Sequence, residues 1–397
     1  GKYTRGYVRR QMPADWEFVL DELLHIQRDE EANQHRYHDM ILDSIIATGA
    51  ADNVIAALAA LIKSLAVDRL HVVGDIFDRG PEPAGIVETL MRQRHIDIQW
   101  GNHDILWLGA ACGSPSCVFT VLRITCDYGN ELTLERRYGV SLRALAEFCE
   151  RVYGSSDKKA RKLALSVLGF KLEGQVIMRH PGYGMDDRLM LERINYNDWT
   201  VKLDTGVYPL NTTHLPTIDP AEPYRLSSEE QALVDEYVDA FEDSQSLRRH
   251  LNFIYQRGST YLTCNGNLLY HGCIPLTKDG GFAQVRHGGK WYSGKALMDY
   301  ADAVVKSAWV SGEESALDMM WYLWCGNDSP FSGRVFHTFE RAMVDDESTW
   351  AEPRNPYFKF WDNEDTARMI LAEFGLDPDP GHIINGHTPV KARKGES

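Results

Sequence analysis

Apolar residues in the first part of the chain recur at steps of three and four residues. This spacing predicts helices across residues 15–65, because positions three and four apart share one face of a helix. The clearest apolar stripe consists of Val54, Ile55, Leu58, Leu61, Ile62 and Leu65. We therefore expect residues 1–66 to form a helical N-terminal segment that packs through this stripe.

Short β-rich runs begin after this segment. Residues 70–73 and 96–100 are predicted strands, and residues 82–95 between them are a predicted helix with Pro83 in its first turn, where a missing N–H costs little. This order is a βαβ unit, so the two strands should be parallel neighbours. In such sheets, ligands bind at the carboxyl ends of the strands.

The middle of the chain is mostly typical of helices and loops. We expect residues 131–255 to be a mainly helical insertion, in which SSEE at 227–230 supplies an N-cap serine and glutamates in the first turn. The insertion would separate two halves of a catalytic core, residues 67–130 and residues 256–397.

The second half of this core mixes both kinds of element. Its predicted helices lie near 293–325 and 363–374, and its predicted strands are 259–263, 267–270 and 382–385. Alternating strands and helices on both sides of the insertion predict an α/β fold.

Composition narrows the class of protein. A net charge of −15 argues against nucleic acid and against an anionic membrane surface, but not against a phosphorylated substrate. The most apolar stretch, residues 54–67, contains Lys63 and is too short to span a bilayer. None of the seven cysteines forms a CxxC pair, and the start of the chain has no apolar signal core. We expect a cytoplasmic protein with reduced thiols.

Four predicted strand ends each pair a glycine with a possible metal ligand. The motifs are GD, GNHD, HG and GH, and the possible ligands are Asp75, Asn102, His271 and His387. Each residue alone has an ordinary structural explanation, but the joint pattern predicts a metal site. Two oxygens and two imidazoles suit Mn²⁺, Fe²⁺ or Zn²⁺ better than Ca²⁺ or Mg²⁺.

Three further residues near these motifs suit phosphate chemistry. His103 follows Asn102 and is a candidate general acid, with Asp78 as the carboxylate that orients it. Arg79 offers a planar fork for phosphate oxygens. The structural alternatives are a turn cap for Asp78 and a surface ion pair for Arg79, which would be worth only ~0–1 kcal/mol.

The series GDxxDRG, GNHD, HG and GH resembles the metallophosphoesterases of the phosphoprotein-phosphatase type. This resemblance implies a calcineurin-like αββα sandwich of mixed sheets, here with the largely helical insertion. It implies that Asp75 bridges two metals and that Asn102, His271 and His387 complete the second metal site. The implied catalytic residues are His103 and Asp78, and Arg79 would bind phosphate.

A narrower resemblance rests on longer segments between residues 67 and 397. They include FKLEGQVIMRHP, NGNLLYHGCIP, MMWYLWCGNDSPF, HTFERA, ILAEFGL and HIINGHTPVK, and the start KYTRGYVRRQMPADWEF fits as well. Together they look like the class III fructose-1,6-bisphosphatases of Firmicutes-type bacteria. This resemblance implies hydrolysis of fructose 1,6-bisphosphate to fructose 6-phosphate and phosphate in gluconeogenesis, usually with Mn²⁺ or Mg²⁺.

The chain departs from that family's pattern in one respect. The family takes further ligands of its first metal from a D-x-H-G motif upstream of GD, and none of the 14 histidines here has an aspartate two residues before it. The family also continues beyond GHTPVK. We therefore expect either a core fragment of a longer protein or a chain that omits segments. In both cases the dinuclear site would have a full ligand set for only one metal.

The expected mechanism uses two metals ~3.5–4 Å apart that share Asp75 and a hydroxide, which attacks the 1-phosphate. Arg79, helped by Arg257, would neutralise the developing charge, and His103 would protonate the leaving oxygen. The metal is expected to be Mn²⁺, with Mg²⁺, Fe²⁺ and Zn²⁺ as alternatives. Candidates for the second phosphate, by charge alone, are Arg179, Arg188 and Lys391, although surface roles are the simpler explanation.

Two other functions stay open at this point. One is a phosphatase for phosphoproteins or dinucleotides, and the other is a non-catalytic paralogue that binds a sugar phosphate. The expected partner is a small sugar bisphosphate rather than nucleic acid or a membrane, and a homo-oligomer is possible.

Overall fold

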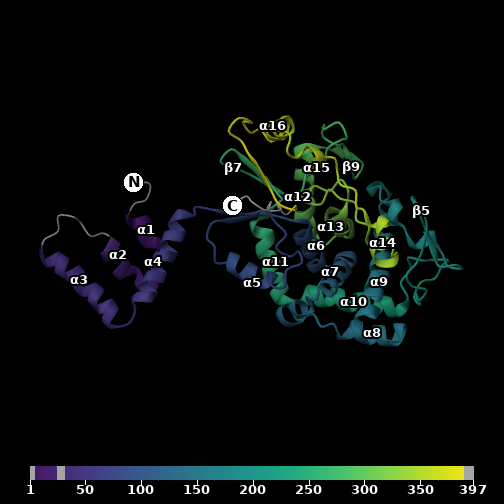
Figure 1. Cartoon of the computed structure of the whole chain (residues 1–397), viewed down its shortest axis with the longest axis horizontal. Helices are drawn as coiled ribbons and strands as arrows, with labels where there is room; N and C mark the ends of the chain where they lie inside the picture. Colours follow the sequence, from purple (N-terminus) through teal and green to yellow (C-terminus); the bar gives the residue numbers. More distant parts are fainter. Residues whose placement is uncertain (1–4, 25–31, 389–397) are drawn as a thin grey trace. The chain divides into compact units, whose positions relative to one another are not determined.

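The computed structural model describes residues 5–24 and 32–388, and the chain forms two compact units, Gly1–Leu70 and His71–Ser397 (Figure 1). Within the described ranges, no single helix is long and apolar enough to cross a membrane. The two helical segments 33–47 and 51–66 reach the length and apolar composition of a membrane span only when taken together. The pair is bent by 114° at the break between them.

The described residues of the N-terminal unit are mainly helical, as predicted, and residues 1–4 and 25–31 lie outside the described ranges. Its elements are α1 (Arg5–Gln11), η1 (Ala14–Trp16), α2 (Glu17–Leu24), α3 (Ala32–Ala47) and α4 (Ala51–Ala66). They enclose a small core that contains Met12, Leu20, Ile45, Val54, Ala57 and Leu61.

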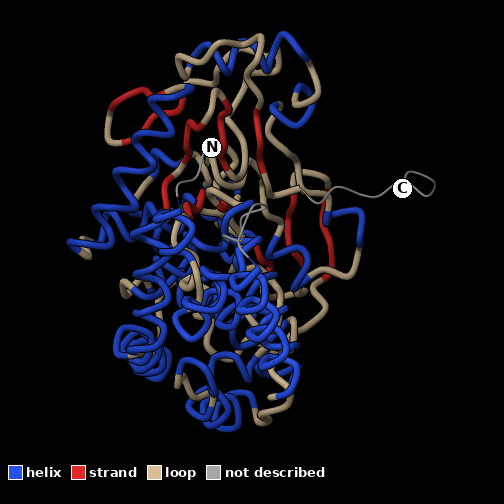
Figure 2. The backbone as a smooth tube through the Cα atoms, turned by 90° about the vertical axis from the view of Figure 1, so that its left-hand side faces the viewer, coloured by secondary structure: helices blue, strands red, loops and turns tan. Residues whose placement is uncertain are grey.

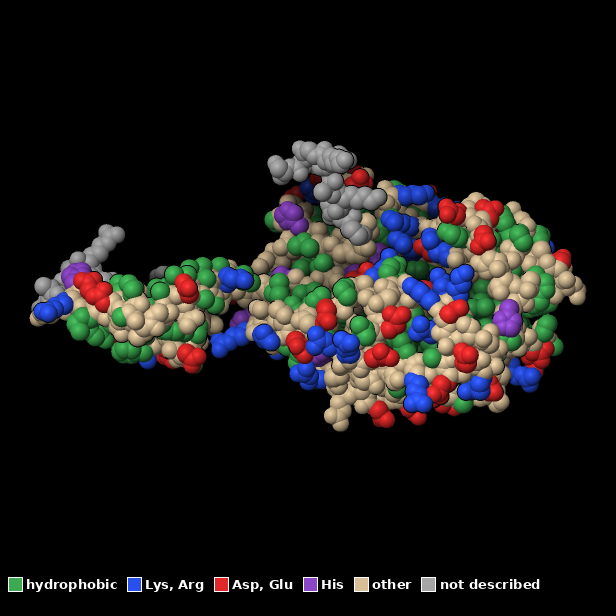
Figure 3. All heavy atoms as spheres, turned by 60° about the horizontal axis from the view of Figure 1, so that its bottom comes forward, with side chains coloured by type: hydrophobic (Ala, Val, Ile, Leu, Met, Phe, Trp, Pro, Cys, Tyr) green, Lys and Arg blue, Asp and Glu red, His purple; other side chains and the backbone are tan. Residues whose placement is uncertain are grey.

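The predicted stripe on α4 is only partly correct. Val54 and Leu61 are buried, but Ile55 and Ile62 are 63% and 65% exposed. At 100° per residue both isoleucines lie about 80–100° round the helix from Val54, so they fall outside the face that packs. Apolar side chains therefore cover part of this unit's surface, visible in green at the left of Figure 3.

Two three-stranded sheets of the larger unit position the polar motifs. One sheet has the order β1-β2-β6, with β1 (Leu70–Val72), β2 (Ile96–Gln99) and β6 (Gly258–Ser259), and β2 and β6 are parallel. The other has the order β11-β8-β7, with β11 (Ile383–Asn385) parallel to β8 (Asn267–Tyr270) and β7 (Tyr261–Cys264) antiparallel to it.

These strands confirm the predicted β-runs, and β1 and β2 are sheet neighbours as expected. The helix after β1 is α5 (Pro83–Leu90), which is shorter than the predicted helix at 82–95. Pro83 does occupy the start of the helix.

Helices form much of the rest of the larger unit. They are α6 (Asn102–Ala111), α7 (Pro115–Asp127), η2 (Thr133–Tyr138), α8 (Arg143–Tyr153), α9 (Lys158–Arg179), α10 (Ser228–Asp243) and α11 (Gln245–Arg257). Every residue of α6 is buried, and α7–α11 gather in one part of the unit while most strands lie in another (Figures 1 and 2). Ser227 caps α10 through the backbone N–H of Glu230, as expected.

The middle stretch is not only helix and loop. It contains an antiparallel sheet of β3 (Ile194–Asn195), β4 (Thr200–Leu203) and β5 (Gly206–Pro209), which the sequence analysis missed. The signal was present, because Val201 and Leu203 are buried while Lys202 between them is exposed, the period of a strand with one covered face.

The last part of the chain is mixed. Its helices include α12 (Gly294–Ser311), α13 (Glu314–Cys325), α14 (Thr338–Met343), α15 (Tyr357–Phe360) and α16 (Glu364–Glu373), and β9 (Val285–His287) pairs with β10 (Lys290–Tyr292). The predicted helices near 293–325 and 363–374 are thereby confirmed. The fold is α/β, with small open sheets and many helices.

Candidate metal and phosphate site

The loops after β1 and β2 lie against each other. Gly74 has φ 85°, and a Cβ added there would lie 2.5 Å from the carbonyl oxygen of Gln99 and 2.7 Å from Nδ1 of His271. Real side chains do not approach that closely, so only glycine permits this packing. The glycine of the GD motif therefore allows the two loops and His271 to approach one another.

Asp104 ties these two loops together. Its buried carboxylate accepts backbone N–H bonds from Asp75 (2.8 Å), Ile76 (3.0 Å), Phe77 (3.2 Å) and Gly101 (2.9 Å). Burial and the nearby charge of Asp75 raise the pKa of Asp104 to about 6, and the backbone bonds oppose that rise. The carboxylate fixes the backbone that presents Asp75.

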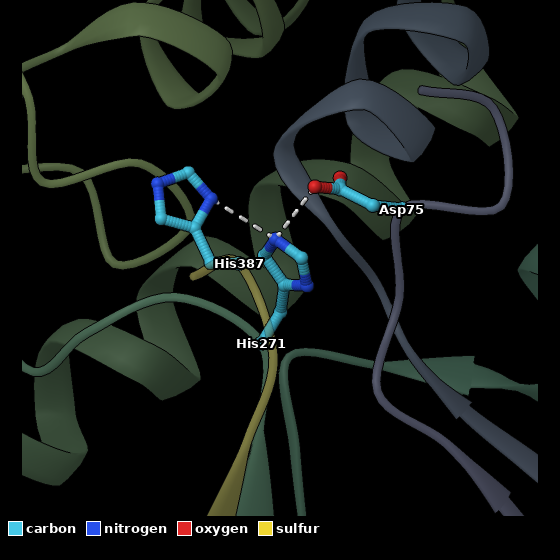
Figure 4. A group of neighbouring side chains, drawn as sticks. All are labelled: Asp75, His271 and His387. Atoms are coloured by element: carbon cyan, nitrogen blue, oxygen red, sulfur yellow. Dashed lines mark hydrogen bonds and ion pairs between the residues drawn. The ribbon is translucent and has the colours of Figure 1, made fainter. Parts of the chain in front are cut away.

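Asp75, His271 and His387 converge as a possible metal cluster (Figure 4). His271 Nε2 lies 3.2 Å from Oδ2 of Asp75 and 3.3 Å from Nδ1 of His387. Its other ring nitrogen, Nδ1, donates to the carbonyl oxygen of Val73 at 2.6 Å. A backbone carbonyl on the second nitrogen is the usual way in which a metal-binding imidazole is oriented.

Two of these three residues have unusual backbone conformations. Asp75 has φ 56° and His387 has φ 61°, and only four non-glycine residues in the described ranges have positive φ. Such conformations cost of order 1–3 kcal/mol each and gather at functional sites. The fold therefore accepts strain to aim these two side chains.

Two orphaned polar atoms beside the cluster suit a metal ion. Oδ1 of Asn102 and Nε2 of His387 are buried and have no hydrogen-bond partner in the described part of the chain. A buried polar atom without a partner is costly unless something binds it. Asn102 itself opens α6, and the next backbone N–H, that of His103, donates to Oδ1 of Asp75 at 3.2 Å.

The pKa directions reflect one shared charge. Although burial opposes it, the positive charge and hydrogen bond of His271 lower the pKa of Asp75. Burial lowers the pKa of His271, but the charge and hydrogen bond of Asp75 outweigh burial, so this pKa is raised. Burial first, then the charge of His271, lowers the pKa of His387 to about 3. Together these directions favour a charged, hydrogen-bonded pair of Asp75 and His271.

His103 and Asp78 lie together as predicted. His103 Nε2 is 3.0 Å from Oδ1 of Asp78, and Arg79 Nε is 3.1 Å from the same oxygen. Both are ion-pair distances, but the angles do not fit hydrogen bonds. Burial lowers the pKa of His103, while the charges of Asp75 and Asp78 raise it. Nδ1 of His103 is buried and has no hydrogen-bond partner in the described ranges, so no described protein group engages this nitrogen.

Arg257 is not brought to this group. It is exposed and precedes β6, which runs parallel to β2, so it lies at the opposite end of that strand pair from the loop that carries Asn102. Arg334 is found there instead. Burial, and then the charges of Arg354 and Arg79, lower the pKa of Arg334. The charge of Arg334 also helps to lower the pKa of His387.

Arg334 was missed because no motif marks it. It lies between the quoted segments MMWYLWCGNDSPF and HTFERA and belongs to neither, and its position beside GH depends on long-range packing. Of the charge-based candidates for the second phosphate, Arg188 is buried against Glu173 at 3.2 Å and Arg179 pairs with Asp318 at 2.8 Å. Lys391 lies outside the described residues.

Comparisons with known proteins agree with the motifs. The model of the Firmicute fructose-1,6-bisphosphatase family matches residues 1–397. This chain is 45%, 44% and 42% identical to proteins named fructose-1,6-bisphosphatase class 3 from Clostridium novyi, Porphyromonas gingivalis and Alkaliphilus metalliredigens. All of the chain is covered, but only 63%, 64% and 64% of those proteins.

No solved structure matches the chain. These coverages mean that the chain spans less than two thirds of the length of the curated relatives named above. A family model that matches every residue, together with the GD, GNHD, HG and GH motifs, settles the family. The chain belongs to the Firmicute fructose-1,6-bisphosphatase family.

Proposed function

We propose that the protein containing this chain hydrolyses fructose 1,6-bisphosphate to fructose 6-phosphate and phosphate. The observation that carries the proposal is the family match over residues 1–397. The relatives named above carry the name of this activity, and the cluster of Asp75, His271 and His387 beside His103 and Arg79 suits phosphate-ester hydrolysis. We also propose that the two motif-bearing sheets are the layers of a calcineurin-like αββα sandwich.

A divalent metal, in our proposal Mn²⁺, would be held by Asp75, Asn102, His271 and His387. The mixed oxygen and imidazole donors and the orphaned atoms of Asn102 and His387 fit such an ion. When bound, it would supply positive charge for the phosphate and a water of lowered pKa. Further ligands for a second metal would come from elsewhere in the protein.

The chain's own residues have separate roles in this proposal. Arg79 and Arg334 bind the reacting phosphate, because both are positive and lie beside the cluster. His103 donates a proton to the sugar oxygen that leaves, and Asp78 favours the protonated ring. Asp104 holds the backbone of Asp75 in place.

A substrate panel tests the proposed function. The purified native protein with Mn²⁺ should have a kcat/KM for fructose 1,6-bisphosphate at least about 100-fold above those for a phosphopeptide and a dinucleotide, a margin of about 2.8 kcal/mol. The measurement is phosphate release at matched substrate concentrations. A preference for the phosphopeptide would favour the protein phosphatase alternative, and binding without any release would favour the non-catalytic one.

Metal binding should release a proton from His271. Because Asp75 raises the pKa of His271, the protonated ring competes with the metal, whereas His387 is already neutral. We expect Mn²⁺ to bind more weakly, and with more proton release, at about pH 6 than at about pH 8. Calorimetry in buffers of different ionisation enthalpy measures this release.

The matched control is His271→Gln, which should bind Mn²⁺ more weakly and release fewer protons. Equal proton release by the parent and by this variant would contradict His271 as the source of the proton.

A further inference from the structure

A cavity of about 560 Å³ opens beside the metal cluster. His103 and Arg79 are part of its wall, so it begins at the proposed reacting phosphate. Small-molecule sites occupy roughly 300–1,000 Å³, so the cavity is the size of a metabolite site.

The lining of this cavity is cationic in an acidic protein. Two acidic side chains, Asp127 and Glu352, face five basic ones: Arg79, Arg123, Lys162, Arg334 and Arg341. The whole chain carries a net charge of −15, so a basic excess here is local and specific. A concentration of like charges in a concave site attracts an anion.

The basic residues divide into two sets. Arg79 and Arg334 belong to the reacting side, as described above. The other three come from α7 (Arg123), α9 (Lys162) and α14 (Arg341), and they are held by neighbouring carboxylates. These three are more than the reacting phosphate needs.

The carboxylates hold the second set in place. Asp127 lies 3.3 Å from Nζ of Lys162 and 3.7 Å from Nη1 of Arg123. Glu352 lies 3.1 Å from Nε of Arg341 and 3.5 Å from Nη1 of Arg334, so it sits between the two sets. Three cations restrained by two anions leave a net positive charge at a fixed place.

The cavity also contains a platform for a small ring. Trp324 and Phe336 are stacked, with ring centroids 5.0 Å apart and planes inclined by 21°. The indole N–H of Trp324 is buried and has no hydrogen-bond partner within the described residues. Aromatic side chains in a cavity wall suit a sugar, whose C–H groups can contact the rings.

We propose that Arg123, Lys162 and Arg341 bind the phosphate of the sugar bisphosphate that is not cleaved. Trp324 and Phe336 then contact the sugar between the two phosphates. This inference rests on the proposed function, and it deepens it by assigning the residues that select a bisphosphate over a monophosphate.

Lys162→Met is the most direct test, because Lys162 is 54% exposed and its replacement should not disturb folding. We expect KM for fructose 1,6-bisphosphate to rise about tenfold with kcat little changed, since the lost contact is the same in ground and transition states. Hydrolysis of p-nitrophenyl phosphate, which has no second phosphate, should stay within about twofold. Arg123→Met combined with Lys162→Met should enlarge the effect on KM.

Lys306→Met is a matched control. Lys306 is 53% exposed and paired with Asp302, which is 20% exposed, whereas Lys162 is 54% exposed and paired with Asp127, which is 23% exposed. Its KM should equal that of the parent. A second readout avoids catalysis: without metal, calorimetry should show that fructose 6-phosphate binds about tenfold more weakly to Lys162→Met than to the parent.

The two proposals fail in different ways. If the parent hydrolyses the bisphosphate and both the single and double variants keep its KM and its affinity for fructose 6-phosphate, the second-phosphate site is refuted alone. If the parent hydrolyses p-nitrophenyl phosphate but not fructose 1,6-bisphosphate, the proposed function is refuted.

Discussion

Replacing His103 by alanine should reduce the turnover of fructose 1,6-bisphosphate by about 10²–10⁴-fold, the usual contribution of a general acid. Mn²⁺ affinity should hardly change, because the His103 side chain is not in the cluster of Asp75, His271 and His387. The measurements are kcat with the sugar bisphosphate and metal affinity by calorimetry. His250→Ala, which removes another buried histidine, is the control and should keep its turnover.

The leaving group separates acid catalysis from a structural effect. A sugar alkoxide needs a proton as it leaves, but p-nitrophenolate does not, so His103→Ala should impair p-nitrophenyl phosphate hydrolysis far less. An equal loss with both substrates would contradict the acid role.

The pH profile gives an independent check on the same residue. The acid works only when protonated, so activity should fall as pH rises through the pKa of His103. Burial lowers that pKa and Asp78 raises it, so Asp78→Asn should move this fall to lower pH. An unchanged profile would mean that Asp78 does not act through His103.

The sequence was most informative where function constrains short motifs. GD, GNHD, HG and GH identified Asp75, His271 and His387, and the structure brings these three together. Such residues can be found because a metal needs particular donors at strand ends, and glycines must stand beside them for the loops to approach.

Residues that act through tertiary packing were not found in this way. Arg334 lies outside every motif quoted from the sequence. The second-phosphate candidates chosen by charge alone were paired elsewhere, Arg188 with Glu173 and Arg179 with Asp318. An arginine looks the same in sequence whether it faces a ligand, a carboxylate or water. The cavity lining is what adds Arg123 and Arg341 to Arg79 and Arg334 as arginines that face this site.

The same limit applies to the fold. The helices and the motif-bearing strands followed from periodicity, but the stripe on α4 included Ile55 and Ile62, which are exposed. Apolar residues at the edge of a stripe satisfy the spacing without meeting a partner. The sheet of β3–β5 was missed because its strands are short and stand within a helical stretch.

Replacing Asp104 by alanine should lower the free energy of unfolding by about 4 kcal/mol, because it orphans four backbone N–H groups at once, each worth roughly 1–3 kcal/mol when buried. It should also weaken Mn²⁺ binding by about 10–100-fold, since the loop that presents Asp75 is no longer fixed. Urea denaturation and metal titration measure the two effects.

Two variants show whether Asp104 positions the site or only stabilises the fold. Asp104→Asn keeps one oxygen for two of the N–H groups but turns a donor toward the other two, so it should lose part of both properties. Asp318→Ala removes another buried aspartate, which accepts bonds from Arg179 and His180, and should lower stability while leaving Mn²⁺ affinity unchanged. If Asp104→Ala also left Mn²⁺ affinity unchanged, the carboxylate would stabilise the fold without positioning Asp75.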